Sequence, residues 1–336
     1  MANIPDSDQK AATAAPLANG NRPAPDVVSL NWTTEDPENR IGVFQSGRYT
    51  SPNKLLGFAL AVVLTAAFFT LVVYVFSATP YLQPFAIVFI RPGNLWTTGP
   101  ATFLFFWSTS LLVLKGRKLK FQQRALDLAS VPQHAEFVLN ETSARAVLER
   151  VHTLVDHPRY FILLNRIDRA LSNLHNIGGL SDVATILKGQ AENDENQIAS
   201  SYTLISAMVW GIPVLGFIGT VQGLSQAIGT FTRTLASSAD LNAIKANLQG
   251  VTGGLATAFE TTLVALVMAL LIQFYLNALQ KQETDFLDEC NDYCHLHVIS
   301  KLRLADRNRS EVRAATEKPA GASVQADGLS PMPKPQ

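Results

Sequence analysis

Apolar residues gather in four long runs that polar stretches separate. Two runs lie early in the chain, at residues 55–77 and 95–114, and two lie late, at 202–231 and 254–279. A helix needs about 20 mainly apolar residues to cross the hydrocarbon layer of a membrane. Each run has that length, so the pattern predicts four transmembrane helices. Glu260, in the fourth run, is the one acidic or basic residue within the four.

The polar stretches have helical rather than strand-like periodicity. Apolar residues recur at helical spacing in "ARAVLERVHTLV" and "YFILLNRIDRALSNLHNI", and Pro158 separates the two segments. The run "NETSA", at residues 140–144, predicts the start of the first helix. The third and fourth spans are expected to extend as helices through residues 182–202 and 280–307. Since no period-two pattern is sustained, the sequence predicts an all-α fold.

The predicted organisation follows from these runs. Its segments, in chain order, are a disordered tail at 1–50, a transmembrane hairpin at 51–115, a helical region at 116–200, a second pair of spans at 201–281, a helical extension at 282–306 and a disordered tail at 307–336. The tails are rich in Ala, Pro, Asn and Asp, and are expected to bury too little apolar surface to offset the entropy of the chain.

Composition supports a membrane protein. Charged residues are 16% of the chain, against about 25% in an ordinary soluble domain. The net charge of zero gives no general nucleic-acid footprint. The two cysteines, Cys290 and Cys294, are one helical turn apart and are predicted to be reduced thiols. With the nearby histidines they lack zinc-finger spacing, so no metal is expected. No hydrolase, nucleotide or cofactor motif is present, and the sequence predicts no enzyme and no cofactor.

Basic residues predict the orientation of the spans. Five of them follow the second span directly: Lys115, Arg117, Lys118, Lys120 and Arg124. The first loop holds only Arg91. Because positive charge collects on the cytoplasmic side, both termini and residues 115–200 are predicted to be cytoplasmic. The same basic run could also attract anionic lipid.

Small residues form stripes on the last two spans. The third span carries Pro213, Gly216, Gly219, Thr220, Gly223 and Ala227, and the fourth carries Ala258, Thr262, Ala265 and Ala269. Small residues let helix backbones approach closely in lipid, so the stripes are expected to face each other. The threonines have two interpretations: they bond their own backbone, or they serve a polar pathway. Likewise, Pro213 kinks a helix either for gating or without function.

The last two spans resemble the MotA/TolQ/ExbB family of ion-driven motor channels. The matching segments are "PVLGFIGTVQGLSQAI", at residues 213–228, and "GLATAFETTLVALVMALLIQFYLN", at residues 254–277. Together they cover about a quarter of the chain. The arrangement of four spans, with a large insert between the second and the third, is most similar to the MotA layout.

The resemblance implies a proton channel subunit of a motor complex in the bacterial inner membrane. Five copies would surround two copies of a single-span partner, like those called ExbD, TolR or MotB, whose intramembrane aspartate carries the ion. It also implies that Thr220 and Thr262 face the lumen beside that aspartate. A hydroxyl can donate to a carboxylate, accept from a carboxylic acid or bind Na⁺.

Three further residues are pore-lining candidates: Thr257, Thr261 and Glu260. ExbB-like members have a glutamate where this chain has Thr257, and Glu260 is the nearest carboxylate. Glu260 either replaces that acid at the pore rim or pairs with a lysine or arginine near the outer surface. Leu271 stands where many members have proline.

Two alternative functions remain open at this level. A Na⁺-coupled complex would use the same hydroxyls, and a passive scaffold would use the glycines for packing only. The process that is driven, whether motility, import, envelope maintenance or phage defence, does not follow from the sequence.

Overall fold

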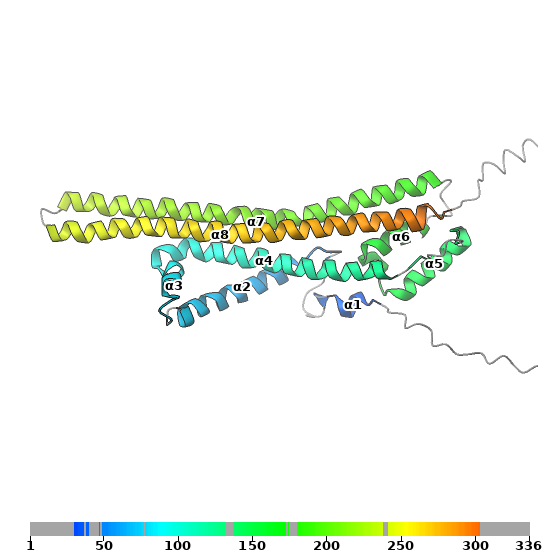
Figure 1. Cartoon of the computed structure of the whole chain (residues 1–336), viewed down its shortest axis with the longest axis horizontal. Helices are drawn as coiled ribbons and strands as arrows, with labels where there is room; N and C mark the ends of the chain where they lie inside the picture. The colour runs from blue at the N-terminus through cyan, green and yellow to red at the C-terminus, as the bar shows by residue number, and fades with distance from the viewer. Residues whose placement is uncertain are drawn as a thin grey trace, which may run out of the picture.

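The computed structural model is an elongated bundle of α-helices (Figure 1). It describes residues 30–36, 38–39, 47, 49–76, 78–128, 130–131, 137–172, 174, 180–237 and 241–302. Within these residues there is no β-strand, and the only β-type pairings are two isolated bridges. The predicted all-α fold is confirmed. The predictions for 1–29, for most of 40–48 and for the tail from residue 303 fall outside the described residues.

Four helices have the length and composition to cross a membrane, which confirms the four predicted spans. The first is α2, Lys54–Leu71, which continues as a π-helix, η2, Val72–Phe76. The second is α4, Pro92–Asp127, and between them lies α3, Gln83–Ile90. The third and fourth are α7, Leu180–Ser237, and α8, Leu241–Cys294.

The two last helices form one long antiparallel hairpin (Figure 1). At about 1.5 Å per residue, the 58 residues of α7 and the 54 residues of α8 extend about 87 Å and about 81 Å. Both lengths far exceed a hydrocarbon layer of about 30 Å. The helices therefore continue beyond the membrane as predicted, and α2, α3 and α4 cover one side of the hairpin.

Two shorter helices lie in the segment between the second and third spans. The first is α5, Glu141–Leu154, and begins where "NETSA" predicts, since the Asn140 and Ser143 side chains form a capping box. A short 3₁₀ turn, η3, Pro158–Tyr160, follows it. The second is α6, Ile162–Ser172, whose buried face meets α7 and α8. The predicted pair of amphipathic helices is confirmed.

The predicted tail at residues 1–50 is wrong for its last part. Residues 32–35 form a helix, α1, Trp32–Glu35, whose first side chain is 3% exposed. The Trp32 ring stacks on Tyr160, with centroids 5.0 Å apart, and meets the edge of Phe161. The predicted disorder rested on local composition, whereas the apolar surface that orders this segment is supplied by residues more than 100 positions away.

Asp156 stabilises the position of α1 through hydrogen bonds. Its carboxylate accepts hydrogen bonds from Trp32 N at 2.9 Å, from Thr33 N at 3.1 Å and from Thr33 Oγ1 at 2.8 Å. Burial raises the pKa of Asp156, but these hydrogen bonds to its charged form outweigh burial and lower the pKa overall. The carboxylate therefore remains ionised at neutral pH and holds α1 against the end of α5.

The polar end of the bundle is a stem, formed by residues 115–127 of α4, 180–203 of α7 and 280–294 of α8 together with α1, α5 and α6. Among the described residues, three buried ion pairs lie within the stem or against it. They are Lys115–Glu283 at 3.0 Å, Lys118–Glu38 at 2.7 Å and Arg166–Asp194 at 2.7 Å, with every side chain at most 1% exposed. Two members of the basic run, Lys115 and Lys118, are thus buried structural groups.

The cysteines lie in the core of the stem. Cys290 and Cys294 are both free and buried. Burial raises the pKa of both thiols, that of Cys294 to about 11. Since the thiolate is the reactive form, both groups are unreactive as nucleophiles at neutral pH.

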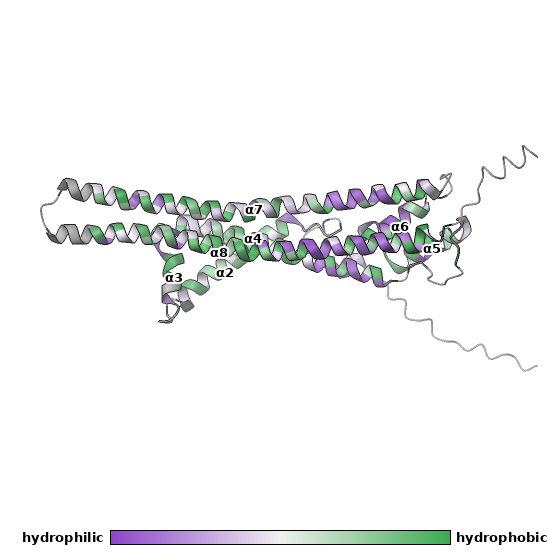
Figure 2. Cartoon of the chain, turned by 45° about the horizontal axis from the view of Figure 1, so that its top comes forward, coloured by the Kyte–Doolittle hydropathy of each residue, from purple (hydrophilic) through white to green (hydrophobic). Residues whose placement is uncertain are grey.

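Hydropathy separates the stem from the membrane part (Figure 2). Hydrophilic residues gather along the stem, whereas hydrophobic residues dominate α2, α3 and the middle of the hairpin. Many large apolar side chains of the middle are exposed, among them Val63, Phe217, Phe259 and Leu263, each 63–66% exposed. A surface of this kind suits lipid or other membrane helices.

Candidate functional site

The contact between α7 and α8 in the membrane part is a seam of small residues. A Cβ atom added to Gly216 would lie 2.6 Å from the Ala265 Cβ. One added to Gly223 would lie 2.7 Å from Gly254 O and 2.9 Å from Ala258 N. Only a hydrogen atom fits at these positions, so the backbones of the two helices meet directly. Ala258 and Ala265 are 3% and 2% exposed.

The facing stripe on α7 differs in one position from the expected one. Its buried members are Gly216, Gly219, Gly223 and Ala227. A Cβ on Gly219 would overlap Thr261 Oγ1. Thr220 is instead beside the seam, partly exposed, because its neighbour Gly219 takes the central place. The helix continues through Pro213, which lies one turn before the seam.

The seam gives a prediction for a matched pair of glycines. Gly223→Ala is expected to destabilise the protein by about 1–3 kcal/mol, because the new methyl group meets backbone atoms of α8 that cannot turn aside. Gly229→Ala, in the same helix, has open space around its Cβ and is expected to be neutral or stabilising, since alanine favours helix. Thermal unfolding of the purified protein measures the difference. Equal stability of the two variants would contradict a close backbone contact at Gly223.

Thr262 joins the two helices by a hydrogen bond. Its hydroxyl lies 3.1 Å from Gly216 O on α7 and 3.2 Å from Ala258 O on its own helix. The missing side chain at Gly216 leaves that carbonyl accessible. With its proton directed to a carbonyl, the hydroxyl retains lone pairs that can accept a proton donor.

Thr220 lies one turn after Gly216 and is therefore on the same edge of the hairpin as Thr262. Its hydroxyl donates to Phe217 O at 2.6 Å, within its own helix. The two threonines that the resemblance singles out are thus on one edge of the hairpin. Both are partly exposed, and both keep acceptor capacity toward whatever faces this edge.

Glu260 is held by residues from the start of α4. Arg91 Nη1 lies 3.0 Å from Glu260 Oε2, and Asn94 Nδ2 donates to the same oxygen at 3.1 Å. Asn94 also donates to Val88 O at 2.8 Å, which ties the end of α3 to this cluster. Of the two expected roles for Glu260, pairing with a basic residue is thus observed. Arg91 and Asn94 were missed as site residues, although Arg91 is the only base in the first loop.

The five pore-lining candidates fall on two sides of α8. Thr257 is covered by the start of α4, where Gly93 approaches it, and Arg91 Nη1 lies 3.5 Å from its hydroxyl. At about 100° per residue, Glu260 and Thr262 are about 160° apart around the helix. Thr261 is buried between them in the seam. The structure therefore puts Thr220 and Thr262 on one edge of the hairpin and separates them from Thr257 and Glu260.

Metal binding has no support from the described residues. No group of three or more His, Cys, Asp or Glu side chains among them is arranged to hold a metal ion. The Cys290 and Cys294 thiols are packed in the stem core. The chemistry of the site therefore rests on hydroxyls, backbone carbonyls and one paired carboxylate.

Comparison with known proteins identifies the helical hairpin. Residues 162–291, from α6 to near the end of α8, match the sequence model described as the MotA/TolQ/ExbB proton channel family. No curated protein and no solved structure matches the chain. The match contains the whole seam, both edge threonines and Glu260. Residues 162–291 of this four-span membrane protein are a domain of the MotA/TolQ/ExbB proton channel family, whose members are channel subunits and not enzymes.

Proposed function

We propose that this chain is the ring-forming subunit of a membrane motor that is driven by the proton gradient. Five copies surround two helices of a single-span partner related to ExbD, TolR or MotB. The intramembrane aspartate of that partner carries the proton, and the ring supplies no titrating group of its own. The family match supports proton conduction in a motor complex. The ring size and the partner are our own extension.

The observation that carries the proposal is the edge formed by Thr220 and Thr262. Two hydroxyls lie on this edge of helices that are otherwise lined there by apolar and small residues. Both hydroxyl protons are directed to backbone carbonyls, so lone pairs are left for a partner. Polar groups at this depth are costly and are typical of an ion pathway. We therefore assign the lumen to this edge of the hairpin.

The chemistry of the edge favours a protonated partner. A carboxylic acid can donate its proton to a threonine oxygen, and a carboxylate can accept from the same hydroxyl after a rotation. Holding the carboxylate in a low-dielectric lumen is costly, and protonation removes that cost. One charge that crosses 100 mV releases about 2.3 kcal/mol, which is the energy available to turn the ring against its partner.

Glu260 has a separate role in this proposal. It lies on the side of α8 that faces α3 and α4, with Arg91 and Asn94 attached to it. We assign it to the rim of the channel, where the Arg91 pair compensates its charge. We place Thr257 beside it at the rim and Thr261 in the wall between rim and lumen, since its hydroxyl bonds the backbone of α8.

The proposed orientation places the stem in the cytoplasm of a bacterium, with the protein in the inner membrane. Arg117, Lys120 and Arg124 remain as basic residues of α4 outside the buried ion pairs named above, just after the apolar part of the helix. This excess of positive charge favours the cytoplasmic side. Both termini of the chain then lie in the cytoplasm as well.

The proposal is tested by coexpression of the full chain with a single-span, aspartate-bearing protein encoded beside it. The mass of the purified complex is expected to give five copies of the chain to two of the partner. In liposomes that contain a pH-sensitive dye, the complex is expected to dissipate an imposed proton gradient without added Na⁺. Ion flux that requires Na⁺ would contradict proton coupling and support the sodium-coupled alternative. A complex that assembles and conducts neither ion would support a scaffold.

A further inference from the structure

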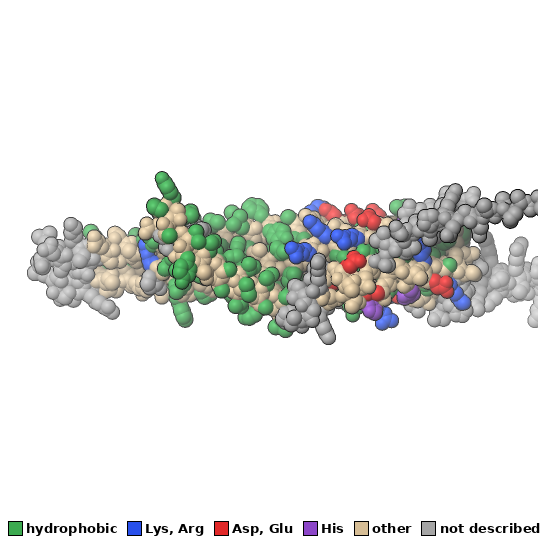
Figure 3. Space-filling view, turned by 90° about the horizontal axis from the view of Figure 1, so that it is seen from below, with side chains coloured by type: hydrophobic (Ala, Val, Ile, Leu, Met, Phe, Trp, Pro, Cys, Tyr) green, Lys and Arg blue, Asp and Glu red, His purple; other side chains and the backbone are tan. Residues whose placement is uncertain are grey.

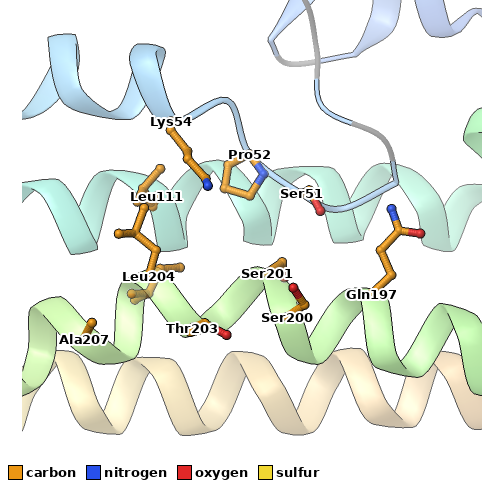
Figure 4. Close-up of a pocket in the computed structure, with 11 residues that line it drawn as sticks. Ser51, Pro52, Lys54, Leu111, Gln197, Ser200, Ser201, Thr203, Leu204 and Ala207 are labelled. Atoms are coloured by element: carbon orange, nitrogen blue, oxygen red, sulfur yellow. The ribbon is translucent and has the colours of Figure 1, made fainter.

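A pocket of about 540 Å³ opens between the start of α2, the middle of α4 and the beginning of the membrane part of α7. Figure 4 shows its lining. Lys54 extends from α2 beside Pro52 and Ser51, and Leu111 comes from α4. The opposite wall belongs to α7, with polar Gln197 and Ser200 at one end and apolar Leu204 and Ala207 at the other.

Among the described residues, the lining has one cation and no carboxylate. Lys54 is exposed, and its ammonium has no ion-pair partner among the described residues. Hydroxyl and amide groups that can donate hydrogen bonds also line the pocket: Ser51, Gln197, Ser200 and Thr203. An ammonium with several neutral donors and no competing acid suits a phosphate group. It does not suit a cation or an acidic peptide that would need several bases.

Polarity changes along the pocket in the direction in which it changes across a membrane interface. From Gln197 to Ala207, α7 rises about 15 Å, and its side chains that line the pocket change from polar to apolar. Leu111 precedes the buried Lys115 by one turn, and Lys54 is the last charge before the apolar part of α2. The polar end therefore lies at the stem and the apolar end lies toward the hydrocarbon layer.

Figure 3 shows where charged side chains begin relative to the apolar band of the molecule. Lys and Arg side chains gather next to the band of hydrophobic side chains, with Asp and Glu side chains among and beyond them. Anionic headgroups attract basic residues at such a boundary. A phosphate bound by Lys54 would thus be at the depth of the headgroups of the bilayer.

We propose that this pocket binds an anionic phospholipid. The phosphodiester lies against the Lys54 ammonium, with Ser51 and Ser200 as hydrogen-bond donors. An acyl chain follows Leu204 and Ala207 along α7 beside Leu111. The lipid fills the space between α2 and α7 and thereby links the first span to the channel hairpin. The proposal depends on the four membrane spans and is independent of which ion the channel conducts.

The test titrates the detergent-purified, delipidated full chain with dioleoylphosphatidylglycerol and counts bound lipids by native mass spectrometry. Lys54→Gln is expected to weaken binding about five-fold, as a loss of about 1 kcal/mol per base at an anionic surface implies. Ala207→Trp, which fills the apolar end, is expected to remove the bound lipid. The matched control is Lys120→Gln, which removes a base of α4 that does not line the pocket and is expected to leave binding unchanged.

Several results would overturn the proposal. Equal loss of lipid binding in Lys120→Gln and Lys54→Gln would show that the lipid responds only to general surface charge. Equal affinity for dioleoylphosphatidylcholine would show that the Lys54 cation does not select an anionic lipid. Competition by glycerol 3-phosphate at the same concentration would show that the acyl chain does not contribute to binding. A photoreactive residue at position 207, in membranes, is expected to label lipid. Labelling of a second copy of the chain instead would assign the pocket to a subunit interface.

Discussion

Replacement of Thr220 and Thr262 together by valine is expected to lower proton flux roughly 100-fold. Valine keeps the volume of threonine but has no hydroxyl. Two hydrogen bonds to a charged partner, each contributing at least about 1.5 kcal/mol, are lost together, and about 3 kcal/mol corresponds to that factor. Flux into dye-loaded liposomes measures the effect, and the mass of the purified complex shows whether the ring still forms.

The controls separate the pathway from packing. Thr252→Val removes a hydroxyl that bonds Leu248 O and Gln249 O in the same helix but lies on an exposed turn, away from the edge. It is expected to conduct normally. Thr262→Ser keeps the hydroxyl and is expected to retain most of the flux. Normal flux in the Thr220→Val, Thr262→Val double variant, with an intact ring, would leave the scaffold as the better account.

The stem is expected to depend strongly on the buried pair of Lys115 and Glu283. Lys115→Met leaves the Glu283 carboxylate in the core without its cation, and removal of one partner of a buried pair costs about 3–5 kcal/mol. The lysine also donates to Thr50 Oγ1 at 3.2 Å and to Ser201 Oγ at 2.8 Å. Its loss therefore also loosens the contact between the N-terminal segment and α7. Thermal unfolding of the purified protein is the measurement.

A second substitution and an exposed pair provide the comparison. The double variant Lys115→Met, Glu283→Met removes both charges and is expected to recover much of the stability. Lys281 and Asp285, also on α8, form an exposed pair one turn apart, with side chains 74% and 49% exposed. Lys281→Met is expected to cause no measurable change, because solvent screens such pairs. A single variant at position 115 as stable as Lys281→Met would show that the burial of Lys115 is not essential.

Much of the fold was predictable because its signals are local. A charge-free apolar run such as residues 55–77 predicts a membrane span from its own composition, and α2 and η2 form in this run. The capping box at Asn140 and the break at Pro158 lie within a few residues of what they control. The seam was predictable in part, since glycines at three- and four-residue spacing mark a close contact. The choice of Gly219 instead of Thr220 for its centre required the actual rotation of α7.

The candidate site was less accessible to sequence reasoning. Glu260 was recognised as unusual, but its partners Arg91 and Asn94 lie 169 and 166 residues away. The division of the candidates between two sides of α8 depends on the cover that α3 and α4 give to one side. No local pattern specifies which side of a helix another helix will cover.

Hydropathy and residue size within a few turns were enough to predict the four spans, the long hairpin of the last two helices and the stripes of small residues that join them. Packing of the whole chain was needed to show that Lys115 and Lys118 are buried ion-pair partners, that residues 32–35 belong to the core, and that Glu260 is paired with Arg91. These three findings share one cause. The free energy of a buried charge or of an apolar side chain is set by its neighbours in space, and here those neighbours come from distant parts of the chain.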